Sequence, residues 1–65
     1  MITAKGKQLD WHEGLTVREV LDILGYNFPS VLVQVNGTIV RQKAWDSAVV
    51  PDEARVEVRP IIAGG

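Results

Sequence analysis

The stretch that decides the fold reads Val31-Leu32-Val33-Gln34-Val35-Asn36-Gly37-Thr38-Ile39-Val40. Its first half is almost wholly apolar and carries β-branched residues at alternate positions, which is typical of a buried strand. Asn36-Gly37 is a strong two-residue hairpin signal, because both residues tolerate the positive φ angles of such a turn. The sequence therefore predicts a buried strand over 31–35, a tight turn and a short returning strand over 38–40.

A short helix is predicted before this hairpin, over residues 17–24. Thr16 can cap its first turn, Glu19 can return the hydrogen bond as a capping box, and Gly25 fits the position that ends a helix. Residues with i, i+3, i+4 and i+7 spacing form one apolar stripe: Val17, Val20, Leu21 and Leu24. A helix of about two turns does not persist alone in water, so it must pack on a sheet.

Residues 2–12 predict two more strands. Ile2 and Ala4 alternate with polar residues, and Leu9 and Trp11 do the same after the turn signal Lys5-Gly6-Lys7. These two strands precede the helix.

The segment that follows the hairpin, residues 42–50, has no clean period. It is predicted to be irregular, with a helical turn that tucks Trp45 against the core. Pro51-Asp52-Glu53-Ala54 then has the composition of a turn.

Residues 55–59 form the last predicted strand. They alternate strictly, so Val56 and Val58 face the core while the charged residues face water. Pro60 removes a backbone donor and ends the strand.

The element order is thus β-β-α-β-β-β, which belongs to the α+β class. A strand that follows a helix crossover can pair in parallel, so we expect a mixed sheet with the helix packed on one face, as in the β-grasp (ubiquitin-like) fold. The 65 residues suffice for one domain only. We expect a single domain over residues 1–60 and a flexible C-terminal tail over residues 61–65.

Composition excludes several classes of function. Without cysteine there is no disulfide, thiolate metal site or cysteine nucleophile, which suits a cytoplasmic protein. The formal charge is −1 and the Lys and Arg residues are scattered along the sequence, so we expect no nucleic-acid or membrane partner. No run approaches the roughly 18 apolar residues of a membrane span, and the first residues lack the pattern of a signal peptide.

Candidate side-chain sites are weak. His12 is the only histidine and cannot assemble a metal site alone, so a solvated turn residue is the favoured interpretation. The adjacent Asp52 and Glu53 would point apart in a turn, and solubility explains them better than acid–base chemistry. Trp11 and Trp45 could stack on bases, but without a basic groove we expect them to belong to the core.

The last five residues, Ile61-Ile62-Ala63-Gly64-Gly65, are a stronger candidate. Glycine loses much conformational freedom on ordering, so this segment is a poor end to a globular domain. Taken alone, a frayed terminus or an expression scar is the favoured interpretation of this segment. Two residues without Cβ would also let the Gly65 carboxylate enter a narrow site on another protein. Exposed Ile61 and Ile62 are typical of an interaction surface, and we expect them to pack in a partner's groove by β-augmentation.

The whole chain resembles the ThiS family, the sulfur carriers of thiamine biosynthesis. The resemblance rests on the run 35–40, Trp45 five residues later, a turn near Asp52, an alternating strand, and the ending Ile62-Ala63-Gly64-Gly65. The small subunit of molybdopterin synthase shares the fold and the Gly-Gly end and stays open as an alternative. The turn that usually reads Asp-Gly-Asp in the family is Asp52-Glu53-Ala54 here, which leaves its geometry in question.

The resemblance implies a carrier rather than an enzyme, with no bound cofactor or metal. A ThiF-like adenylating enzyme would use ATP to activate the Gly65 carboxylate, and a persulfide donor protein would convert it to a thiocarboxylate. Thiazole synthase (ThiG-like) would receive the sulfur. Gly64, Ala63, Ile62 and Ile61 would thread into the partner sites.

Three other functions stay open from the sequence. The carrier could serve molybdopterin synthesis or another sulfur-transfer pathway. The Gly-Gly end also fits a ubiquitin-like protein modifier that is attached to lysines, and an inert tail fits a plain β-grasp interaction module.

Overall fold

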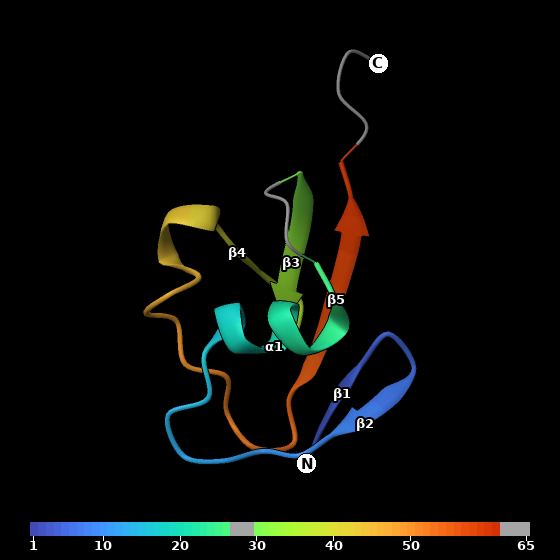
Figure 1. The fold of residues 1–65 in the computed structure, drawn as a ribbon, viewed down its shortest axis with the longest axis vertical. Helices are drawn as coiled ribbons and strands as arrows, with labels where there is room; N and C mark the ends of the chain where they lie inside the picture. Colours follow the sequence, from blue (N-terminus) through green and yellow to red (C-terminus); the bar gives the residue numbers. More distant parts are fainter. Residues whose placement is uncertain (27–29, 62–65) are drawn as a thin grey trace.

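The computed structural model describes residues 1–26 and 30–61, which form a five-stranded sheet and one α-helix (Figure 1). The elements are β1 Ile2–Ala4, β2 Lys7–Leu9, α1 Val17–Leu24, β3 Val31–Val35, β4 Thr38–Val40, the 3₁₀ turn η1 Gln42–Ala44, and β5 Arg55–Pro60. The predicted order β-β-α-β-β-β is confirmed.

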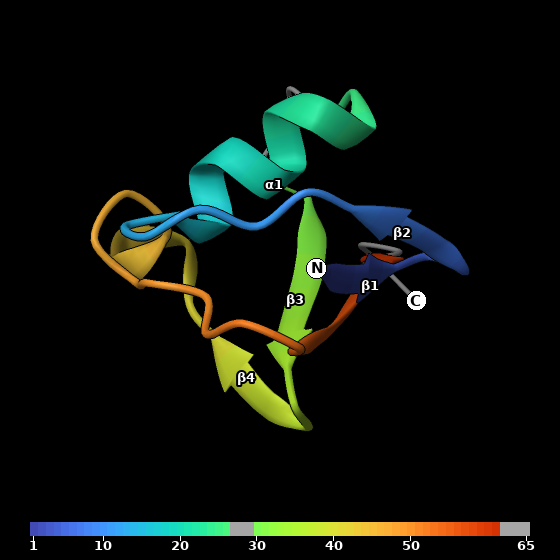
Figure 2. The same ribbon diagram turned by 90° about the horizontal axis from the view of Figure 1, so that it is seen from below.

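The sheet is mixed and has the strand order β2-β1-β5-β3-β4. β1 pairs with β5 in parallel, and the other three pairings are antiparallel. Helix α1 lies across one face of this curled sheet (Figure 2). This topology is the β-grasp arrangement, so the predicted fold class is confirmed. Among the described strands, β3 alone has no exposed residue, which agrees with its apolar sequence.

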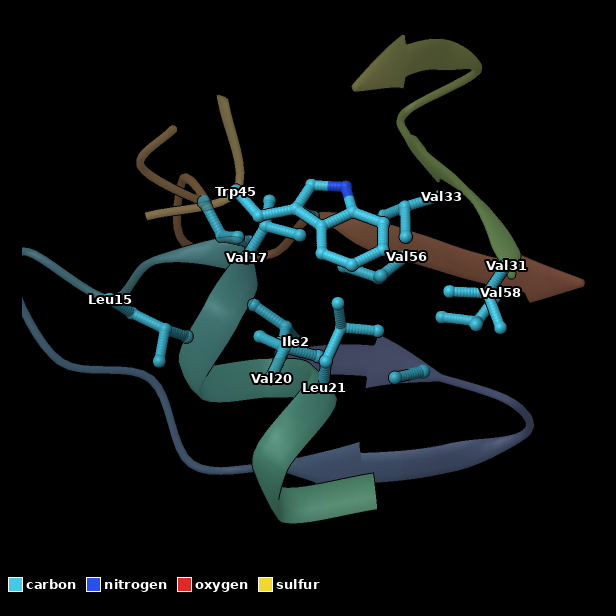
Figure 3. Close-up of a cluster of buried hydrophobic side chains, with 13 residues drawn as sticks. Ile2, Leu15, Val17, Val20, Leu21, Val31, Val33, Trp45, Val56 and Val58 are labelled. Carbon is cyan, nitrogen blue, oxygen red and sulfur yellow. The ribbon is translucent and has the colours of Figure 1, made fainter. Parts of the chain in front are cut away.

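Trp45 lies at the centre of the core. Its side chain is only 2% exposed, and its indole Nε1–H donates to the Val40 carbonyl at 3.1 Å. Figure 3 shows the ring among the side chains of Val17, Val33 and Val56. The prediction that a turn over residues 42–50 tucks Trp45 into the core is confirmed.

Helix α1 has the predicted bounds. The Glu19 amide donates to Thr16 Oγ1 at 3.3 Å, and Gly25 has the left-handed φ of 86° that ends the helix. The Glu19 carboxylate, however, lies 2.9 Å from His12 Nε2. The reciprocal half of the predicted capping box is therefore wrong, because this carboxylate contacts the loop before the helix instead.

Strand β2 is shorter than its alternating pattern predicted. It ends at Leu9, whereas the pattern continued to Trp11. The indole Nε1–H of Trp11 donates to the Val50 carbonyl at 2.7 Å, so this residue is held by the loop before β5 rather than by the sheet ladder. A tertiary hydrogen bond thus overrides the local pattern.

The turn over residues 51–54 forms as predicted. The Ala54 amide donates to the Pro51 carbonyl at 3.3 Å. Glu53 stands where the family pattern places glycine, and it adopts a left-handed φ of 64°. Its amide donates to Asp52 Oδ1 at 2.8 Å and to the Met1 carbonyl at 3.0 Å. The turn therefore keeps a glycine-like backbone without glycine.

Candidate functional site

The end of β5 is the candidate site, because the chain leaves the sheet there. Strand β5 is one residue longer than the predicted 55–59: Pro60 pairs with Val31 and is its last residue, although it has no backbone donor. One more backbone bond follows, from the Ile61 amide to the Ser30 carbonyl at 2.9 Å. The Ile61 side chain is 50% exposed, which confirms that an apolar residue is presented at this point.

Of the predicted site residues, only Ile61 belongs to the described part of the chain. Ile62, Ala63, Gly64 and Gly65 lie outside the described residues. The predicted flexible tail and the predicted attachment site at Gly65 therefore stay predictions.

A groove opens beside Ile61, and sequence reasoning did not find it. Its volume is about 680 Å³, and β3, β4, η1 and the chain after β5 contribute to it. We call it the Ile61 groove; its lining residues are Val31, Leu32, Ile39, Val40, Arg41, Gln42, Lys43 and Ile61. The groove therefore combines aliphatic walls with two cationic side chains at the point where β5 ends.

The sheet face opposite the helix carries charged side chains from β5. Val56 and Val58 are buried under α1, so the alternate residues Arg55, Glu57 and Arg59 face outward. The Glu57 carboxylate lies 3.3 Å from Arg55 Nε and 3.3 Å from Arg59 Nη2. Register places Leu32 beside Arg59 and Gln34 beside Glu57, so this charged row is continuous with the Ile61 groove.

The other candidate side chains stay isolated. His12 is exposed; its Nδ1 lies 3.0 Å from the Glu13 carbonyl oxygen and its Nε2 lies 2.9 Å from Glu19 Oε2, and no other described residue hydrogen-bonds to the ring. Within residues 1–26 and 30–61, no group of three His, Cys, Asp or Glu side chains could hold a metal ion. None of the helices in these ranges is long and apolar enough to cross a membrane.

Two exposed ion pairs shift pKa values. The Glu13 carbonyl and the Glu19 carboxylate both hold the His12 ring and raise the pKa of His12 above its ordinary value. The Met1 ammonium lies 2.8 Å from Asp52 Oδ1; it lowers the pKa of the Asp52 carboxyl, and Asp52 in turn raises the pKa of the amino group. The first pair joins the loop before α1 to the helix, the second joins the N-terminus to the turn before β5, and both lie outside the Ile61 groove.

Comparison with known proteins gives the family. The model of the ThiS family matches residues 1–65. The chain is a member of the ThiS family. Its fold is similar to the crystal structure of the thiamine biosynthesis protein ThiS from Geobacter metallireducens, with 31% sequence identity, a TM-score of 0.78, and coverage of 98% of this chain and 97% of that chain. It is also 25% identical over 64 residues to the "Uncharacterized protein ycf40" of Porphyra purpurea, over 98% of this chain and 90% of that protein.

Proposed function

We propose that this protein is a sulfur carrier of thiamine biosynthesis and that the Gly65 carboxylate carries the sulfur. The observation that carries the proposal is the ThiS-family match, which runs through Ala63, Gly64 and Gly65. The similarity in fold to a thiamine biosynthesis protein supports the same role.

The chemistry needs activation, because a carboxylate is a poor electrophile. One carboxylate oxygen of Gly65 attacks the α-phosphorus of ATP on an adenylating enzyme, and pyrophosphate leaves. The terminal sulfur of a protein persulfide then attacks the acyl carbon, and AMP leaves. A thiol of the donor cleaves the resulting S–S bond, so that the donor becomes a disulfide and Gly65 ends in a thiocarboxylate. Thiazole synthase receives this sulfur.

In this proposal the carrier provides a terminus and a docking surface, and its partners provide the active sites. Exposed Ile61 begins the segment that enters the partner, and its amide anchors that segment to Ser30. Glycine at positions 64 and 65 removes the side chains that a narrow site would exclude.

Intact-mass spectrometry of the protein with its native terminus tests the proposal. Incubation with ATP, a ThiF-like adenylating enzyme and a persulfide donor should add the mass of one sulfur-for-oxygen exchange, and fragmentation should place it at Gly65. Reactions without ATP are the control. A gain elsewhere in the chain, or no gain with an enzyme that activates another carrier of the family, would refute the proposal.

The acceptor decides the pathway. The thiocarboxylate should lose its sulfur to thiazole synthase and not to the large subunit of molybdopterin synthase. Sulfur transfer to the molybdopterin synthase subunit alone would instead support the alternative role in molybdopterin synthesis.

A further inference from the structure

Charged side chains are distributed unevenly between the two sides of the sheet. Four of the seven Lys and Arg residues lie on the outer face or line the Ile61 groove: Arg41, Lys43, Arg55 and Arg59. Glu57 is the one acidic residue among them. The other seven acidic residues lie on α1 and in loops: Asp10, Glu13, Glu19, Asp22, Asp46, Asp52 and Glu53. A net charge of −1 therefore conceals a basic sheet face.

The cations of this face are only partly neutralised. Arg55 and Arg59 share the single Glu57 carboxylate, and their side chains are 76% and 70% exposed while that of Glu57 is 29% exposed. Within the described ranges, neither Arg41 nor Lys43 has an ion-pair partner. Four cations against one carboxylate leave this face with an unbalanced positive charge. Arg41 and Lys43 line the Ile61 groove and Arg59 is the residue before Pro60, whereas Arg55 begins β5.

We propose that this basic sheet face, with Arg41 and Lys43 lining the Ile61 groove and Arg55 and Arg59 on β5, docks an acidic surface of the adenylating enzyme. The inference rests on the proposed function, because the enzyme that activates Gly65 must bind the carrier next to Ile61. Positive charge steers an acidic partner to this face and sets its orientation.

The aliphatic part of the groove selects the kind of partner. Leu32, Ile39 and Ile61 can bury an apolar side chain of a protein, and Ile39 is 55% exposed without one. Apolar contact surrounded by charged and polar residues is the usual anatomy of a protein–protein interface. A single-stranded nucleic acid would need aromatic stacking platforms, and none of the described residues that line the groove is aromatic.

Charge reversal on opposite edges of the sheet provides a matched test. The double variant Arg41→Glu/Lys43→Glu changes the basic face next to β4. Lys7→Glu is the control, because Lys7 is exposed on β2 at the other edge of the sheet. Binding of each variant to the ThiF-like adenylating enzyme is measured by calorimetry without ATP, at low and high salt, and pyrophosphate release with ATP is measured in parallel.

The double variant should weaken binding about tenfold or more and raise the KM for the carrier by a similar factor, whereas Lys7→Glu should stay within about twofold. High salt should reduce the difference, since screening weakens the attraction. Equal affinities for the double variant and Lys7→Glu would overturn the docking proposal, and so would wild-type binding to a DNA duplex in place of the enzyme. Charge-dependent binding without pyrophosphate release would support the docking face and refute the proposed function.

Discussion

Replacing Trp45 with Phe should lower stability more than replacing Trp11 with Phe, although both changes remove an indole that donates to a backbone carbonyl. Trp45 donates to Val40 at 3.1 Å and is 2% exposed; Trp11 donates to Val50 at 2.7 Å and is only partly buried. The two variants thus share the lost hydrogen bond and differ in how much packing they lose.

The magnitude follows from these two terms. A lost hydrogen bond costs about 1 kcal/mol in either variant. In the core, the smaller Phe ring also leaves a cavity beside Val17, Val33 and Val56, which adds about 1–2 kcal/mol. We therefore expect a free energy of unfolding lower by about 2–3 kcal/mol for Trp45→Phe and by about 1 kcal/mol for Trp11→Phe. A domain of 65 residues has about 3–10 kcal/mol in total, so the first change is severe.

Urea unfolding followed by far-UV circular dichroism measures both values without relying on tryptophan fluorescence. Unchanged m-values would show that the denatured state is comparable in the three proteins. The melting temperature should fall by roughly 10 °C or more for Trp45→Phe. Equal losses, or a larger loss for Trp11→Phe, would refute the assignment of Trp45 to the centre of the core.

Three further changes test other parts of the molecule. Glu53→Gly should raise the free energy of unfolding by about 0.5 kcal/mol, because it removes the side chain from a left-handed backbone; Glu53→Ala keeps the Cβ and should bring no gain, and equal effects would contradict the argument. NMR titration should give His12 a pKa above its ordinary value of 6.5, and this pKa should fall in Glu19→Gln. The contribution of protonated His12 to folding stability is full below the unfolded pKa and is lost as pH rises through the folded pKa. An unchanged His12 titration in Glu19→Gln would exclude the pairing. Residues added after Gly65 should abolish thiocarboxylate formation without changing the melting temperature, and a tagged protein that still gains sulfur would contradict chemistry at the terminus.

Local signals in the sequence predict most of the fold. The bounds of α1 follow from the cap at Thr16, the apolar stripe and Gly25, which all act within a few residues. The hairpin follows from Asn36-Gly37, whose φ angles of 51° and 83° are those that the dipeptide favours. In these elements the local conformational preferences of the residues agree with the tertiary fold, so the prediction and the structure agree.

The rest depends on contacts between distant residues. The end of β2 could not be predicted, because Trp11 bonds to Val50, which lies 39 residues away. Likewise Arg41 and Arg59 are far apart in the sequence, and only the pairing of β3 with both β4 and β5 brings them to one face. Scattered charges in the sequence therefore did not predict the basic sheet face.

Within residues 30–61, the hydrogen bond from the Ile61 amide to the Ser30 carbonyl is the final backbone contact of the chain with the sheet. Four residues follow it, and a fully extended chain of that length spans at most about 14 Å. This length limits how far a partner's reactive site can lie from the sheet. In the proposed function, docking by the sheet face beside Ile61 would require the ATP site of the activating enzyme and the sulfur-accepting site of thiazole synthase each to lie within that distance of the residues that contact Ile61.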